Sequence, residues 1–167
     1  MKFLRLIFLT MLISAAAAVE PTEHDTIGEV IDNFHNAAKH GDKQRYLGLM
    51  SDDAVFMGTD EWERWPKQPV FIDYVGSRFK DGSGWDYHSV ERVIRISDSA
   101  DFAWFDEVIE SAPNGRFRGT GVLTRQNGEW KIAHYAMSFL IFNENWEDVI
   151  ELSKKTRAQK ESAPAGD

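Results

Sequence analysis

Four extended runs in the second half of the chain constrain its fold more than any other feature. They are rich in aromatic and β-branched residues and cover 85–97, 102–111, 116–126 and 129–142. The short connections SDSAD, APNG and NG join them, and such connections favour antiparallel neighbours. The pattern therefore predicts an antiparallel meander of four strands.

The first half of the chain has a helical pattern. Apolar residues recur at helical spacing over 26–40, over 43–50 and after Pro66, and a short strand is predicted at 54–59. Helical spacing returns after Asn143, before the polar ending ESAPAGD. Helices followed by a run of strands predict an α+β domain in which the N-terminal helices cover one face of a curved antiparallel β-sheet.

The N-terminal stretch MKFLRLIFLTMLISAAAAVEP has the three parts of a secretory signal. Two basic residues accompany an apolar run that ends near Ile13, and small residues follow up to Ala18. This run is too short to span a bilayer. We therefore expect a signal peptide at 1–18, a folded domain at 19–145, and a C-terminal helix with a disordered tail at 146–167. The mature protein is expected in the periplasm or outside the cell, without membrane insertion.

Composition excludes several kinds of scaffold and partner. The chain contains no cysteine, which excludes disulfides and a thiolate zinc site. Its formal net charge is −8, and removal of Lys2 and Arg5 with the signal peptide makes it −10. No basic run then remains apart from KKTRAQK near the C-terminus, so nucleic acid is not an expected partner.

The histidines do not form the close-spaced clusters that metal sites use. The chain has five of them: His24, His35, His40, His88 and His134. No glycine-rich phosphate loop occurs either. We therefore expect neither a metal nor an organic cofactor.

Turn geometry predicts which side chains share a face of the meander. The hairpin signal NG at 127–128 pairs Gly121 with His134. A four-residue loop at 112–115 pairs Asp106 with Gly121. Asp106, Gly121 and His134 then form one row, in which the outer two Cβ atoms lie about 10 Å apart across the glycine.

A carboxylate and an imidazole across such a gap suggest acid/base chemistry. In this interpretation Asp106 is a catalytic base and His134 is its partner or the acid. The alternative is a buried ion pair that fixes the register of the strands, and the pattern alone leaves both open. The next carboxylate, Glu107, falls on the opposite face of the predicted sheet.

Aromatic side chains are expected to enclose the predicted pocket around Gly121. Trp104 and Trp130 would form its wall, with Tyr87 pointing inward. Trp62 and Trp65 would close its mouth, in the stretch TDEWERW. The alternative for Trp65 is local packing before a helix, and Tyr87 can equally be an ordinary packing residue.

Both faces of the predicted sheet are apolar. The face opposite Asp106 carries Phe105, Ile109 and Tyr135 among others. Since the helices cover only one face, the other predicts contact with a second copy of the chain, and hence a homodimer. A bulge in one strand would exchange residues between the two faces.

Several stretches together resemble the nuclear transport factor 2-like superfamily, in its SnoaL-like branch of exported bacterial proteins. They are HGDKQRYLGLMSDDAVFMGTDEWERWPK, FAWFDE, GRFRGTGVLTRQNGEWKIAHY and SFLIFNE, within residues 27–144. The resemblance implies a cone-shaped α+β roll of the cystatin-like kind, usually dimeric, with a cavity between helices and sheet. In some relatives the last strand reads His-x-His-x-Ser, whereas this chain has His134, Ala136 and Ser138, so the second histidine is missing.

The superfamily includes isomerases, cyclases, dehydratases and hydrolases, and also binding modules without activity, so the fold alone does not decide the function. The expected ligand is a small apolar or amphipathic molecule in an internal cavity, with cofactor-free acid/base chemistry of the isomerase, dehydratase or hydrolase kind. The alternative is a non-catalytic dimeric module of the cell envelope that binds a ligand or assembles with a partner.

Overall fold

The computed structural model describes residues 20–82 and 84–162, so the expected signal peptide at 1–18 and the tail at 163–167 lie outside the described residues. The helices are α1 (Glu23–Lys39), α2 (Lys43–Gly48), the π-helical turn η1 (Lys67–Phe71), α3 (Ile72–Arg78), the 3-10 turn η2 (Asn143–Asn145) and α4 (Trp146–Ser162). The strands are β1 (Met50–Met57), β2 (Arg64–Pro66), β3 (His88–Ile96), β4 (Phe102–Ser111), β5 (Gly115–Gln126) and β6 (Glu129–Phe139).

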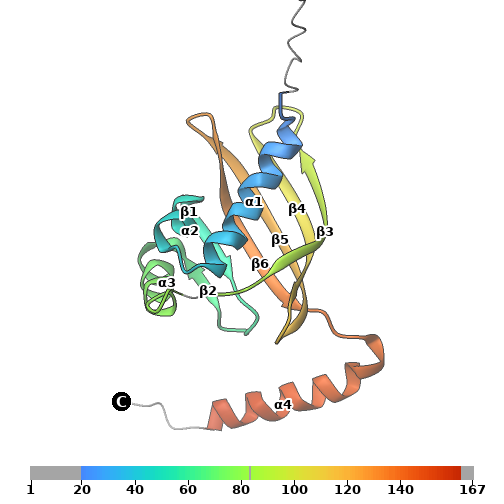
Figure 1. The fold of residues 1–167 in the computed structure, drawn as a ribbon. Helices are drawn as coiled ribbons and strands as arrows, with labels where there is room; N and C mark the ends of the chain where they lie inside the picture. The colour runs from blue at the N-terminus through green and yellow to red at the C-terminus, as the bar shows by residue number, and fades with distance from the viewer. Residues whose placement is uncertain (1–19, 83, 163–167) are drawn as a thin grey trace, which may run out of the picture.

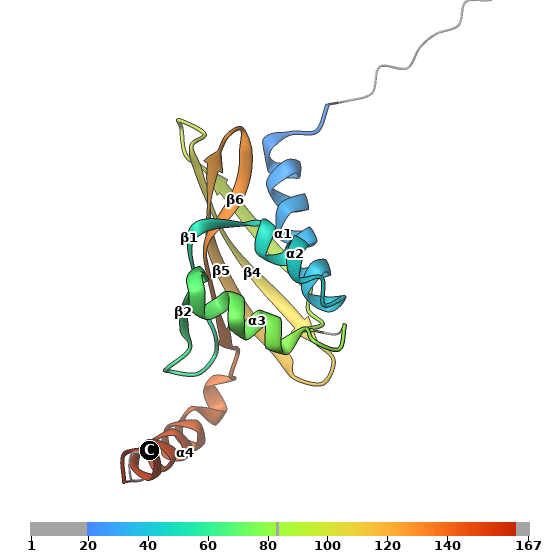
Figure 2. The ribbon, with the colours of Figure 1, turned by 90° about the vertical axis from the view of Figure 1, so that its left-hand side faces the viewer.

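The six strands form one curved sheet in the order β2-β1-β6-β5-β4-β3. The predicted meander β3 to β6 is confirmed, and every neighbouring pair is antiparallel except β1 and β6, which run parallel. Helices α1, α2 and α3 lie on one face of the sheet, which confirms the predicted α+β roll (Figures 1 and 2). The other face of the sheet carries no helix in these views.

Helix α1 is fixed at both ends by local chemistry. The side chain of Thr22 accepts a hydrogen bond from the backbone of Asp25, whose carboxylate accepts one from the Thr22 backbone in return. At the other end Gly41 has a φ of +62°, a backbone conformation that favours glycine. The inner face of α1 is buried against the sheet and brings His35 into the layer between helices and strands.

The predicted register is wrong for β4 with β5 and for the half of the β5–β6 pair that lies away from the hairpin. The loop between β4 and β5 has three residues, not four, since Ser111 pairs with Gly115, so Asp106 lies opposite Thr120. Between β5 and β6, Leu123 pairs with Ile132 but Val122 pairs with His134, so Ala133 is an extra residue that forms a bulge in β6. Each error moves the pairing by one residue, and a one-residue shift turns side chains to the other face.

Helix α4 lies apart from the other helices, beyond the end of the sheet (Figures 1 and 2). It has no buried residue. Two ion pairs tie it to the β1–β2 loop, from Arg157 to Glu61 at 2.7 Å and from Lys160 to Asp60 at 3.3 Å. Among the described residues, no helix has both the length and the apolar character needed to cross a membrane.

Candidate functional site

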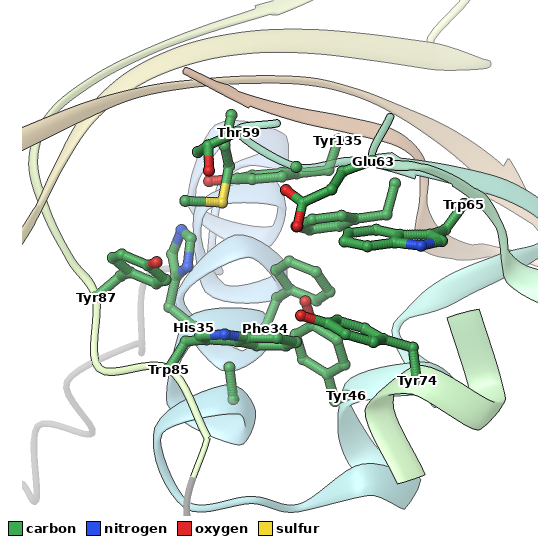
Figure 3. A pocket seen from close by; sticks show the side chains of 14 residues that line it. Phe34, His35, Tyr46, Thr59, Glu63, Trp65, Tyr74, Trp85, Tyr87 and Tyr135 are labelled. Atoms are coloured by element: carbon green, nitrogen blue, oxygen red, sulfur yellow. The ribbon is translucent and has the colours of Figure 1, made fainter. Parts of the chain in front are cut away.

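A cavity of about 120 Å³ opens between the helices and the β1–β2 end of the sheet (Figure 3). Its walls come from α1, α2, β1, the β1–β2 loop, β2, α3, the segment before β3, and β6. The residues that line it are Phe34, His35, Ala38, Tyr46, Phe56, Gly58, Thr59, Glu63, Trp65, Tyr74, Trp85, Tyr87, Tyr135 and Met137.

Aromatic rings make up most of this lining and hold one another in place. Trp65 stacks on Tyr74 with ring centroids 4.5 Å apart, and Tyr74 lies 5.9 Å from Trp85 at an interplanar angle of 26°. Deeper in, Phe34 stacks on Tyr46 at 4.1 Å. Such contacts restrict the rings to few orientations, so the cavity is largely preformed.

A buried carboxylate lies directly behind the cavity wall. Glu107 on β4 is only 1% exposed and is contacted from three elements. His35 Nε2 from α1 lies 2.8 Å from its Oε1, and the Tyr135 hydroxyl from β6 donates to the same oxygen at 3.0 Å. Arg92 from β3 donates from Nε to Oε2 at 3.0 Å, and its guanidinium also pairs with Asp32 at 2.8 Å. The cluster therefore ties helix α1 to three strands.

The balance of effects on Glu107 favours its charged form. Burial alone would raise its pKa, but the hydrogen bonds from His35 and Arg92, the charge of Arg92 and the charge that His35 carries when protonated outweigh burial and hold the pKa of Glu107 below the ordinary value. Burial, and next the negative charge of Glu107, raise the pKa of Tyr135 well above that of a free tyrosine. Glu107 is thus an ionised acceptor, and Tyr135 is a neutral donor to it.

The charge on Glu107 decides which nitrogen of His35 carries hydrogen in the neutral ring. An ionised carboxylate can only accept, so Nε2 must donate to it. Nδ1 then carries the lone pair, and within the described residues it makes no hydrogen bond. Since the ring lines the cavity, this arrangement leaves a proton acceptor on a side chain of the cavity wall.

A second carboxylate, Glu63, lies at the rim between β1 and β2. Figure 3 shows its carboxylate pointing into the space among the rings. The turn is closed by the Gly58 amide, which donates to the Glu63 carbonyl at 2.9 Å, and the Asp60 amide donates to the Glu63 carboxylate at 3.0 Å. A Cβ at Gly58 would collide with this carboxylate, so glycine is what leaves room for it.

Comparison of the sequence with models of protein families assigns the chain to a family. A model of the SnoaL-like domain matches residues 27–142, which is more than half of the chain. The chain belongs to the SnoaL-like domain family. Comparison with curated protein sequences finds no match.

Solved structures share the fold of this SnoaL-like chain at low sequence identity. An NTF2-like protein from Cytophaga hutchinsonii is 19% identical with a TM-score of 0.59, and 72% of this chain aligns with 100% of it. A protein of unknown function with a cystatin-like fold from Nostoc punctiforme is 16% identical, at 72% and 94% coverage and a TM-score of 0.57. A putative ketosteroid isomerase from Parabacteroides distasonis is 14% identical, at 71% and 89% coverage and a TM-score of 0.59. These likenesses confirm the NTF2-like, cystatin-like fold.

The structure corrects the placement of Asp106 and His134. Phe105 and Glu107 are buried under the helices, so Asp106 between them points to the uncovered face of the sheet. His134 pairs with Val122 on that same face, one row away from Asp106. Neither residue lines the cavity, and the predicted row with Gly121 does not exist. The bulge in β6 and the shorter β4–β5 loop are the causes.

The residues predicted to enclose the pocket divide into two groups. Tyr87 and Trp65 do line the cavity. Trp104 lies on the uncovered face and is 41% exposed, and Trp62 lies on the β1–β2 loop and is 68% exposed.

The other two predicted pocket residues, Trp130 and Gly121, lie in packed parts of the protein. Trp130 is buried, and its indole donates to Glu23 at 2.7 Å. At Gly121 the ring of Phe105 occupies the place of a side chain, so no open space lies above this glycine.

Sequence reasoning missed His35 and Glu107, the two residues at the centre of the site. One signal for Glu107 was present, because it occupies an apolar strand opposite Gly119, whose missing side chain makes room for Tyr135 and Glu107. His35 gave none, since a single histidine on a helix face is usually a packing residue. No group of three metal-ligating side chains occurs within the described ranges 20–82 and 84–162.

Proposed function

We propose that this SnoaL-like protein is exported and binds a small molecule in the aromatic cavity, where His35 exchanges a proton with it. The observation that carries the proposal is the imidazole held at 2.8 Å by a buried, ionised Glu107 on the wall of an aromatic pocket. Export rests on the signal-like pattern at 1–18.

The arrangement is suited to cofactor-free acid/base chemistry. Glu107 fixes the ring orientation and stabilises the imidazolium that forms when Nδ1 takes up a proton, as a carboxylate behind a catalytic histidine does. The surrounding rings give an apolar molecule its contact area. A fold neighbour described as a putative ketosteroid isomerase agrees with proton transfer of this kind.

The proposal predicts that phenol, as a small amphipathic probe, enters the cavity. In NMR spectra of the full chain, phenol should shift the indole signals of Trp65 and Trp85 and the ring signals of His35. The indole signals of Trp62 and Trp104 should not move, since both side chains lie outside the cavity. Shifts confined to Trp62 and Trp104, or no saturable shift, would contradict the proposed site.

We also propose that the protein is a homodimer through the uncovered face of the sheet. That face carries large apolar side chains, including Val93, Trp104 and Phe102, at 39–45% exposure in the single chain. Apolar patches on a sheet face without covering helices are typical of interfaces. This observation also supports the second candidate function, a dimeric binding module without catalysis, which would keep the cavity and lack proton transfer at His35.

A further inference from the structure

We infer that the ligand of the cavity is a compact organic cation, such as an alkylated ammonium group, held by the aromatic rings and the Glu63 carboxylate. This inference rests on the proposed binding function of the same cavity and names the class of molecule that it takes.

The ring faces supply the first part of a cation site. The negative faces of tryptophan and tyrosine rings attract cations, most strongly where water is excluded. Trp65 stacks on Tyr74, so these two rings turn one face to each other, while Trp85 lies beside Tyr74. Tyr87 stands on the other side of the cavity from Trp65 (Figure 3). The protein already uses one of these rings in this way, since the guanidinium of Arg78 lies 5.7 Å from the centre of the Trp85 ring.

Glu63 supplies the second part, a carboxylate that accepts a hydrogen bond from the Asp60 amide and forms no ion pair with the described residues. The other acids of the β1–β2 loop are paired, Asp60 with Lys160 and Glu61 with Arg157. Within the described residues no lysine, arginine or histidine forms an ion pair with Glu63. Burial raises the pKa of Tyr74; the negative charge of Glu63 raises it further, and the positive charge of Arg78 lowers it.

The positive charges near the cavity are already engaged, Arg78 with the Trp85 ring and the other two with Glu107. His35 is the one basic side chain in the lining, and its Nε2 is already bound to Glu107. Arg92 is likewise held by Glu107 and Asp32, behind the wall. The whole chain is acidic, with a formal net charge of −8, which raises the local concentration of cations.

The size of the cavity limits the ligand to a small head group. An apolar cavity of roughly 150 Å³ is large enough to bind benzene. The cavity here measures about 120 Å³, which suits a trimethylammonium group or a ring of similar size. Longer parts of a ligand would extend through the opening beside Glu63.

The test compares choline with its neutral isostere, in which a tert-butyl group replaces the trimethylammonium group. Both probes are titrated into the full chain in phosphate buffer, because amine buffers would compete, and binding is followed by tryptophan fluorescence and NMR. We expect choline to bind about tenfold more tightly than the isostere, as cation–π and ionic contacts imply. Glu63→Gln should remove most of this difference and leave binding of the isostere unchanged.

Two further variants control for indirect effects. Glu61→Gln removes the same charge from the same loop outside the cavity and should leave choline binding unchanged. Gly58→Ala keeps Glu63 but displaces its carboxylate, and should weaken choline binding as Glu63→Gln does. If the isostere binds as well as choline, and Glu63→Gln has no effect, the inference is wrong while the proposed binding function stands. If neither probe nor phenol enters the cavity, both are wrong.

Discussion

Replacing Glu107 with alanine is expected to lower the free energy of unfolding by about 3–5 kcal/mol, the usual cost of removing one partner from a buried ionic cluster. The change leaves the Tyr135 hydroxyl and the ring of His35 without their acceptor. Arg92 then keeps Asp32 as a charged partner. Urea unfolding followed by circular dichroism measures the loss.

The neighbouring acid provides a matched control. Asp106 lies on the same strand but points to the uncovered face, and no hydrogen bond of its side chain is found within the described residues. Asp106→Asn is therefore expected to change the stability by less than about 0.5 kcal/mol. Equal effects of the two substitutions would contradict the assignment of Glu107 as the inward-facing carboxylate.

The same cluster predicts how stability depends on pH. The pKa of Glu107 is lower in the folded protein than its ordinary value of 4.5, so the folded state favours the ionised form. Its contribution is fully present above pH 4.5 and is lost as the pH falls through the lower pKa of the folded state. Glu107→Gln should flatten this part of the stability profile, and an unchanged acid limb would show that other carboxylates control it.

Replacing Trp104 with aspartate is expected to weaken the proposed dimer by about 30-fold or more, the effect of removing a central aromatic contact of at least about 2 kcal/mol. Trp104 lies on the uncovered face in a row with Val122 and His134, where a charge would be buried between two sheets. Analytical ultracentrifugation over a range of concentrations measures the dissociation constant.

An exposed tryptophan elsewhere serves as the control for this variant. Trp62 is more exposed than Trp104 but lies on the β1–β2 loop, so Trp62→Asp should leave the dimer intact. A wild-type chain that sediments as a monomer at every concentration would overturn the dimer, as would a Trp104→Asp variant that dimerises like the wild type.

The predictable part of this fold lies in its strands and turns. The run at 102–111 predicted strand β4 to the residue, since strong alternation is a local property of the chain. The run at 129–142 and the hairpin at 127–128 predicted the start of β6, which ends three residues earlier than expected, at Phe139. The register across β5 was not predictable in the same way. A bulge at Ala133 depends on how the sheet curves over the helices, which no local pattern encodes.

The candidate site depended on this register, and so its centre was misplaced. Tyr87 and Trp65 line the cavity of the structure, but they were predicted to enclose a different pocket, above Gly121, where Phe105 fills the space. Asp106 was chosen over Glu107, and a one-residue difference in loop length is all that separates the two faces. His35 comes from a helix 72 residues away in sequence, and only the tertiary fold brings it to Glu107.

The most direct test of the account is the protonation state of the His35 ring, measured by ¹⁵N–¹H correlation NMR on the full chain and on Glu107→Gln. We predict that neutral His35 carries its hydrogen on Nε2, with an unprotonated Nδ1 whose signal responds when phenol or choline enters the cavity. In Glu107→Gln the Nε2–H preference should weaken, since a neutral amide can donate as well as accept. A His35 that carries hydrogen on Nδ1, or whose Nδ1 signal ignores both probes, would contradict a proton acceptor at the cavity wall.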